Sequence, residues 1–172
     1  MDTFKIGDKV IYPNQGIGVI EDIQDETYNG EHIHVHCIRI LANDTLVVIP
    51  SANAPELGIR KLIEEETVEK IFRSIRSGMV DVATNWKGRY KEHLDLMRTG
   101  CMSDMVVVLK SLYYLSLLKP LSFREKKMLE KAKELVVIEI SEVASVPMDD
   151  VEKKILDSLS ICFKDISSQL DS

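Results

Sequence analysis

Residues 4–20 read FKIGDKVIYPNQGIGVI, and this stretch decides the kind of fold that begins the chain. Apolar and polar residues alternate before PNQG and again after it, which is typical of two half-buried strands joined by a tight turn. Gly16 and Gly18 can take the positive φ values that such a corner requires. The stretch therefore predicts a β-hairpin at the start of the protein.

Further strands follow this hairpin. The segment YNGE at 28–31 contains an Asn-Gly pair, a strong hairpin signal, and separates IGVIEDIQ from HIHVHCIRIL. Asn43 and Asp44 then turn the chain into TLVVIP at 45–50. Four or five short strands joined by tight turns within about fifty residues predict a small twisted barrel of the SH3 or Tudor kind.

From residue 67 the apolar period lengthens to three and four, which predicts helices. The expected helices end at Gly or Pro signals and cover about 67–77, 85–98, 103–118, 122–144 and 147 onward. Ser122 and Glu125 form a capping box for the long helix. The sequence thus predicts an α+β protein with a Tudor/SH3-like β-barrel in residues 1–66 and a compact all-α domain in residues 67–172.

Composition narrows the class of protein. Hydrophobic residues make up 45% of the chain and charged residues 29%, as in ordinary soluble proteins. The longest apolar run, at 105–118, is shorter than the ~20 residues that cross a bilayer, and the N-terminus lacks a signal-peptide pattern. Cys37, Cys101 and Cys162 have no metal-binding spacing. We therefore expect reduced thiols and a cytoplasmic location.

Charge is distributed unevenly along the chain. The formal net charge is −6, yet residues 82–133 contain 11 Lys and Arg against 5 Asp and Glu, a local balance of +6. Phosphate binding depends on a local patch and not on the sum of charges. The middle of the chain is therefore a candidate region for nucleic-acid binding, despite the acidic total.

Motifs of enzymes are missing from the sequence. No dinucleotide-binding or P-loop glycine pattern is present. His32, His34 and His36 alternate on one strand, but imidazoles in this arrangement are ~6.6 Å apart in steps and need a bent geometry and a fourth ligand to hold a metal. We expect a solvated histidine face, with no metal and no cofactor. A metal-dependent enzyme at these histidines is a minor alternative.

Residues 84–93, TNWKGRYKEH, place the only tryptophan among cations, and two interpretations are open. On a helix, Trp86 shares an apolar stripe with Tyr90 and Leu94, so the indole could begin the core face. Alternatively, Trp86 lies in the first turn, where an exposed ring can stack on an unpaired base while neighbouring cations hold phosphates.

The combination of FKIGDKVIYPNQGIGVI, VIP, GIRKLI, NWKGRYKEHL and LSFREKKMLEKAKELV resembles the CarD family of bacterial transcription regulators, especially its short stand-alone members. The resemblance extends to about residue 162. It implies a Tudor-like domain that binds the β subunit of bacterial RNA polymerase. It also implies a helical domain that contacts promoter DNA in the minor groove, without sequence specificity, at the upstream edge of the transcription bubble.

The resemblance also implies the residues of two surfaces. DNA contacts are expected from Trp86, which would wedge into the minor groove, and from Lys87, Arg89, Lys91, Lys126 and Lys131. Polymerase contacts are expected from Val48, Pro50 and Ile38. The chain departs from the family at Gly88, where an arginine is common, and at Glu26 and Val48, where some relatives have arginines.

The sequence therefore predicts a monomeric, non-enzymatic transcription regulator that is recruited through polymerase and holds the open promoter complex. The alternative, of a different class, is a protein-interaction adaptor without direct DNA contact. Its β domain would bind a partner, and its basic helices would only be a soluble surface.

Overall fold

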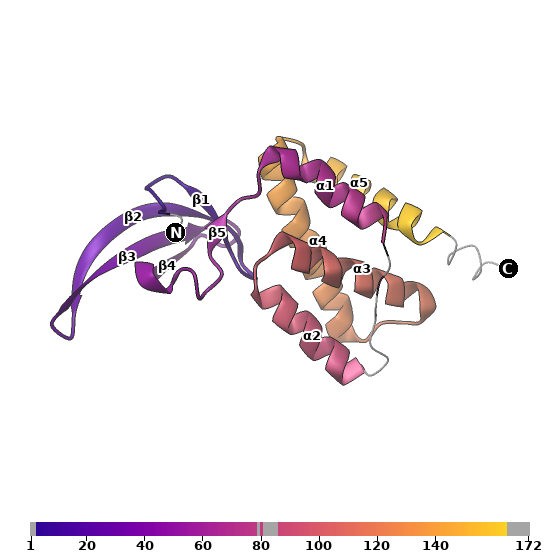
Figure 1. The fold of residues 1–172 in the computed structure, drawn as a ribbon, viewed down its shortest axis with the longest axis horizontal. Coiled ribbons are helices and arrows are strands. Elements are labelled where there is room, and N and C mark those ends of the chain that lie inside the picture. Colours follow the sequence, from indigo (N-terminus) through magenta and orange to yellow (C-terminus); the bar gives the residue numbers. More distant parts are fainter. Residues whose placement is uncertain (1–2, 79, 81–85, 165–172) are drawn as a thin grey trace. The chain divides into compact units, whose positions relative to one another are not determined.

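The structure is a computed structural model that describes residues 3–78, 80 and 86–164, without the side chains of Trp86 and Lys87. The chain divides into two compact units. Met1–Leu62 and Arg98–Gly100 form the first, called here the β unit, and Ile63–Met97 with Cys101–Ser172 form the second, called the helical unit. Figure 1 shows strands followed by helices along the sequence. The predicted α+β class is confirmed.

The β unit is a five-stranded antiparallel sheet in the order β4-β3-β2-β1-β5. The strands are β1 (Lys9–Tyr12), β2 (Gly16–Tyr28), β3 (Glu31–Ile40), β4 (Thr45–Pro50) and β5 (Arg60–Lys61), and a short 3-10 helix, η1 (Ser51–Asn53), follows β4. Within the described residues, β4 and β5 each pair with one neighbour only. β4 therefore presents a free edge.

Glycines at the turns fix the strand register. Asn29 and Gly30 have φ values of 50° and 83°, the two positive values of a type I′ hairpin turn. Gly16 also has a positive φ, of 90°. Gly18, which we expected to share this conformation, is required for a different reason. A Cβ atom there would lie 2.5 Å from Cγ2 of Ile38, so the position allows close approach of β2 and β3.

The core of the β unit is apolar and lies on one face of the sheet. Its buried members are Phe4, Val10, Ile20, Ile38, Ile40, Ile49, Ala54 and Ile59. His36 lies beside this core and is only 8% exposed, so the predicted solvated histidine face is wrong at this position. The reason is the ring of Phe4, which packs edge-on against the imidazole with 5.9 Å between centroids. His32 and His34 remain exposed.

Five helices make up the described part of the helical unit (Figure 1). They are α1 (Glu65–Arg76), α2 (Trp86–Arg98), α3 (Met102–Leu118), α4 (Phe123–Ala144) and α5 (Met148–Cys162). The sequence-based boundary after residue 66 falls in the first turn of α1. No helix among the described residues combines the length and apolarity of a membrane span.

α3 is buried on most of its surface and contacts α1 and α4, as its apolar composition predicts. Lys110, which interrupts the apolar run, is buried as well. Its Nζ donates hydrogen bonds to the carbonyl oxygens of Ser74 at 2.8 Å and Ser77 at 2.6 Å, at the C-terminal end of α1. A cation is favourable there because it satisfies the last carbonyls and the helix dipole.

The half of the predicted capping box that belongs to the Ser122 side chain is confirmed at the start of α4, whereas the carboxylate of Glu125 pairs with Arg89. Oγ of Ser122 accepts a hydrogen bond from the backbone N–H of Glu125 at 3.2 Å. Such a cap contributes about 1 kcal/mol to helix stability. The cap also fixes the position of Glu125, whose carboxylate points into the helical unit and is 5% exposed.

Candidate functional site

The first candidate surface is the free edge of β4. Side chains alternate along this strand, as the pleat of a strand requires. Leu46 and Val48 are 44% and 50% exposed, whereas Val47 and Ile49 pack toward the core of the β unit. Pro50 is half-buried at the end of the strand. We define Leu46, Val48 and Pro50 as the β4 edge surface, which combines unpaired backbone groups with exposed apolar side chains.

Ile38 does not belong to this surface, and its predicted contact with polymerase is wrong. The residue pairs with Val47 across the β3–β4 ladder and has no exposed area. Directly opposed residues of a ladder point to the same face. The side chain of Ile38 is therefore directed into the core, on the opposite face from Val48, whose ladder partner is Cys37.

The second candidate surface lies where α2 and α4 begin. The first turns of these helices are tied together by Arg89 and Glu125. Nε of Arg89 lies 3.0 Å from Oε2 of Glu125, and Nη2 lies 3.1 Å from Oε1. This two-pronged arrangement matches the planar guanidinium to the carboxylate and is among the strongest geometries of an ion pair.

The predicted DNA contact of Arg89 is therefore wrong. The side chain of Arg89 is only 2% exposed, and both ends of the ion pair are inside the helical unit. A buried cation must stay with its counter-charge, because an unpaired buried charge is strongly destabilising. The charge of Arg89 holds α2 against α4 and is unavailable to a phosphate on the surface.

His93 lies one turn after Arg89 on the same helix and is also buried, at 5% exposure. Its Nδ1 has no hydrogen-bond partner among the described residues. Burial lowers the pKa of His93, and the adjacent charge of Arg89 lowers it further against the opposing effect of Glu125. The imidazole is therefore neutral at pH 7, and it adds no charge to the surface.

Exposed cations lie close in sequence to this buried pair on both helices. Lys91 on α2 and Lys126 and Lys127 on α4 are exposed. In the described part of the chain, neither Lys126 nor Lys127 forms an ion pair. The guanidinium of Arg124 lies 5.9 Å from the ring centre of Tyr90, so it reaches across from α4 to α2. We define Lys91, Arg124, Lys126 and Lys127 as the basic surface.

Further along α4 the cations are engaged by carboxylates. Nζ of Lys131 lies 3.6 Å from Oε2 of Glu134. Nζ of Lys133 lies 3.2 Å from Oε2 of Glu130 and 3.0 Å from Oε1 of Glu152. Burial lowers the pKa of Lys133, but its hydrogen bonds with these two carboxylates outweigh burial and raise it. Lys131 is the one predicted DNA contact on α4 whose charge is partly neutralised in this way.

Phe123 is a surface residue that sequence reasoning missed. It is the first residue of α4 and is 72% exposed, with Nζ of Lys127 lying 4.5 Å from its ring centre. The cap predicted from LSFRE assigns no role to Phe123. The available signal was that Phe123 falls outside the buried stripe of Met128, Ala132 and Leu135.

The central residues of the predicted DNA site lie partly outside the described residues. Trp86 and Lys87 begin α2, but their side chains are not among those described. Tyr90 and Leu94 pack against the core of the helical unit, which agrees with the predicted stripe. Gly88 is exposed, and a Cβ atom there would meet no atom within 4 Å.

Clusters of three or more His, Cys, Asp or Glu side chains that could hold a metal ion are absent from the described residues. All three cysteines are free thiols. Burial, followed by the charges of Asp22, Glu26 and Glu21, raises the pKa of Cys37. This thiol is therefore kept protonated and unreactive.

Comparisons with known proteins define the class of this two-unit chain. The family model described as "CarD-like/TRCF RID domain" matches residues 4–63, and the model described as "CarD, C-terminal domain" matches residues 70–156. The RID domain is Tudor-like, so the β unit is a Tudor-like domain followed by a CarD-type helical domain. The chain belongs to the CarD family, as the sequence resemblance predicts.

A relative in Bacillus subtilis supports the assignment over most of the length. YdeB of Bacillus subtilis (strain 168), which is named as a candidate transcription factor, is 29% identical over 143 residues. The match covers 83% of this chain and 94% of YdeB. The two proteins therefore share both units and not a single domain.

Proposed function

We propose that this CarD-family chain is a transcription regulator that binds the β subunit of bacterial RNA polymerase through its β unit. Its helical unit contacts promoter DNA and stabilises the open complex. The observation that carries the proposal is the contrast between two exposed surfaces. Among the described residues, the β4 edge surface is apolar and offers free backbone groups, while the basic surface offers exposed cations that form no ion pair.

The β4 edge surface suits a protein partner. A strand of the partner can add to the free edge through main-chain hydrogen bonds, with alternate side chains giving specificity. Val48 would lie in the centre of the added strand pair, and Pro50 would limit its length because proline has no N–H donor. The RID match and the naming of YdeB as a transcription factor support polymerase as this partner.

The basic surface suits a phosphate backbone. Lys91, Lys126 and Lys127 form no ion pair with another described residue, so they can approach phosphates directly, and Arg124 extends the charge toward α2. Lys87 and Lys131 are proposed as flanking contacts. Trp86 would stack on an unpaired base at the edge of the bubble, since unpairing a base pair is unfavourable by a few kcal/mol and stacking offsets part of it.

The two surfaces have different roles in the proposal. The β4 edge surface brings the protein to polymerase, and the basic surface contacts the promoter DNA. Phosphate contacts alone give weak binding that falls steeply with salt. A second, independent contact with polymerase raises the local concentration of the helical unit at the promoter. We therefore expect low affinity for free DNA and effective action only in the presence of polymerase.

Titration of the full-length protein against a forked promoter duplex, at several salt concentrations, tests the DNA half of the proposal. The matched variants are Lys126→Gln and Lys127→Gln, with Lys153→Gln on α5 as a control at an exposed lysine outside the basic surface. Each lost phosphate contact should reduce the slope of log affinity against log salt by about 0.7–0.9. The control should leave the slope unchanged.

The adaptor alternative predicts a different outcome for the same titration. An adaptor without a DNA site would not bind the forked duplex at low or moderate salt. Binding with identical salt slopes for the parent, Lys126→Gln and Lys127→Gln proteins would place the DNA contact elsewhere.

A further inference from the structure

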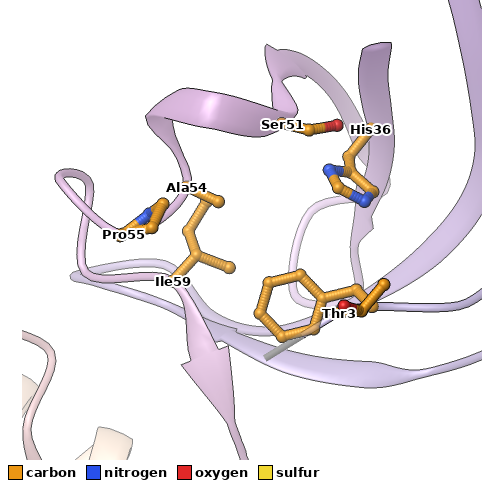
Figure 2. A pocket seen from close by; sticks show the side chains of 7 residues that line it. Thr3, His36, Ser51, Ala54, Pro55 and Ile59 are labelled. Carbon is orange, nitrogen blue, oxygen red and sulfur yellow. The ribbon is translucent and has the colours of Figure 1, made fainter. Parts of the chain in front are cut away.

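A cavity of about 360 Å³ lies in the β unit, next to the end of β4. Figure 2 shows His36 and Ser51 on one side of it, with Ala54, Pro55 and Ile59 across from them. Phe4 completes the apolar wall. The volume is within the range of roughly 300–1,000 Å³ that small-molecule pockets occupy.

Two polar atoms in the wall of this cavity lack partners. Nδ1 of His36 and Oγ of Ser51 are buried and make no hydrogen bond in the described structure. The side chain of His36 is more than nine-tenths buried, since the residue is 8% exposed. Native proteins leave few buried polar atoms unsatisfied. Two such atoms in the wall of one apolar cavity are groups that a bound molecule with a polar atom can satisfy.

The wall of the cavity carries no permanent charge. Its lining contains no Asp, Glu, Lys or Arg among the described residues. Burial lowers the pKa of His36, and the neighbouring His34 lowers it further, so the imidazole is neutral at pH 7. A charged ligand would lose its hydration here without gaining a counter-charge, which is strongly unfavourable.

We propose that this cavity is a binding pocket for a neutral ring or short aliphatic group that carries one hydroxyl, such as a phenol. The apolar part would contact Phe4, Ala54, Pro55 and Ile59, and the hydroxyl would bridge His36 and Ser51. The pocket is separate from the β4 edge surface, because His36 pairs with Ile49 on the core-facing side of β4.

A hydroxyl satisfies both unpaired atoms whichever nitrogen of the imidazole holds the proton. If Nδ1 of His36 carries hydrogen, it donates to the ligand oxygen, and the ligand donates to Oγ of Ser51. If Nδ1 is bare, the ligand donates to it and accepts from the serine hydroxyl. A hydrocarbon of the same shape satisfies neither atom, so it should bind more weakly.

Water alone is a poor occupant of this pocket. The cavity has room for about twelve waters at ~30 Å³ each, and an ordered water needs two to four polar partners. The side chains of the wall provide the two unpaired polar atoms and the hydroxyl of Thr3, on a mainly apolar surface. Displacing weakly held water from such a wall favours an apolar ligand.

Titration of the isotope-labelled, full-length protein by NMR tests the proposal, with benzyl alcohol as the probe. Toluene serves as the analogue without hydroxyl and benzoate as the charged analogue. Benzyl alcohol should give saturable shifts at His36, Ser51 and Ile59. Toluene should bind about tenfold more weakly because the two polar atoms stay unpaired, and benzoate should give no shift at these residues.

The variant Ser51→Ala separates ligand binding from folding. Oγ of Ser51 has no partner in the described structure, so its removal should leave the free energy of unfolding unchanged or higher. Binding of benzyl alcohol should fall severalfold toward the level of toluene, and binding of toluene should not change. Ser160→Ala, at an exposed serine of α5, is the control and should alter neither ligand.

Three results would overturn the pocket. They are no shift at His36, Ser51 and Ile59 at millimolar benzyl alcohol, equal affinity for toluene and benzyl alcohol, or equal binding by the Ser51→Ala and parent proteins. A parallel titration with N-acetyl-tyrosinamide distinguishes the source of the hydroxyl ring. Tighter binding than benzyl alcohol supports a tyrosine of a partner protein, and weaker binding supports a free small molecule. DNA and polymerase are absent from these assays, so their outcome is independent of the proposed function.

Discussion

The two exposed surfaces differ in the forces on which they depend. The β4 edge surface uses backbone hydrogen bonds and apolar side chains, which depend little on salt. The basic surface uses charges in water, which are screened within about 10 Å at 0.1 M salt. The proposed polymerase binding and DNA binding should therefore be separable experimentally. One should respond to an introduced charge and the other to salt and to the loss of charge.

A second contrast lies within the helical unit itself. Arg89 and Lys91 are two residues apart in the same basic segment, yet one is 2% exposed and the other is on the surface. The buried cation holds two helices together, whereas the exposed one is available to a ligand. A cluster of positive charge in a sequence can therefore serve stability and binding at once.

The largest expected effect comes from breaking the buried ion pair. Arg89→Met should lower the free energy of unfolding by about 3–5 kcal/mol, because it leaves the carboxylate of Glu125 buried without its counter-charge. Urea denaturation followed by circular dichroism measures this change. A loss below about 0.5 kcal/mol would be typical of a surface residue and would contradict the interior role of Arg89.

The double variant Arg89→Met with Glu125→Met provides the control for this experiment. It removes both charges and keeps apolar volume, so it should recover most of the lost stability. The Ser122 cap uses the backbone N–H of residue 125 and is retained in the double variant. Equal instability of the single and double variants would indicate that packing, and not charge, is responsible.

The next largest effect is expected at the β4 edge surface. Val48→Glu should weaken binding to the polymerase β subunit by about 2 kcal/mol or more, which is roughly thirtyfold, since it places a charge in an apolar contact. Binding to the forked duplex should not change. A quantitative pull-down or calorimetry with purified β subunit measures the loss.

Ile6→Glu is the matched control for Val48→Glu. Ile6 is 62% exposed in the same unit but lies outside β4. It should bind the β subunit as the parent protein does. Normal retention of Val48→Glu in this assay would show that polymerase uses another part of the chain.

The smallest expected effect is a gain at Gly88. An arginine fits there because a Cβ atom meets open space. It would add an exposed cation to α2 at the position before the buried Arg89. Gly88→Arg should strengthen binding to the forked duplex by up to about fivefold, in line with exposed charge contacts of 0.2–1 kcal/mol. Fluorescence anisotropy at two salt concentrations measures the gain.

Gly88→Gln separates the charge from the helix. Both substitutions remove a glycine from a helix and should raise stability by about 0.5–1 kcal/mol. Only the arginine should improve DNA binding. An equal gain with glutamine would mean that helix order, and not charge, limits the affinity.

Much of the fold could be predicted because local signals agree with it. Apolar periodicity located each helix to within one turn, and the Asn29-Gly30 pair located the hairpin. The Ser122 cap was readable because capping acts over three residues. These features depend on short-range geometry, which a sequence displays directly.

The sites were harder to predict because they depend on contacts between distant residues. Arg89 and Glu125 are 36 positions apart, so the sequence could not show that they pair. The burial of His36 depends on Phe4, which reaches it from the N-terminal end of the chain. Ile38 illustrates a third cause, since its polymerase contact was expected from the family resemblance, and the burial of its side chain depends on how the sheet packs on the core.

The lifetime of the open promoter complex tests directly whether the indole of Trp86 replaces a displaced base. Complexes of polymerase, promoter and this protein are formed and then challenged with heparin, with the parent protein or Trp86→Ala. If the indole replaces a displaced base, its removal should shorten the lifetime by about tenfold while the β subunit is bound as before. Equal lifetimes with parent and variant, at equal occupancy of polymerase, would contradict the claim.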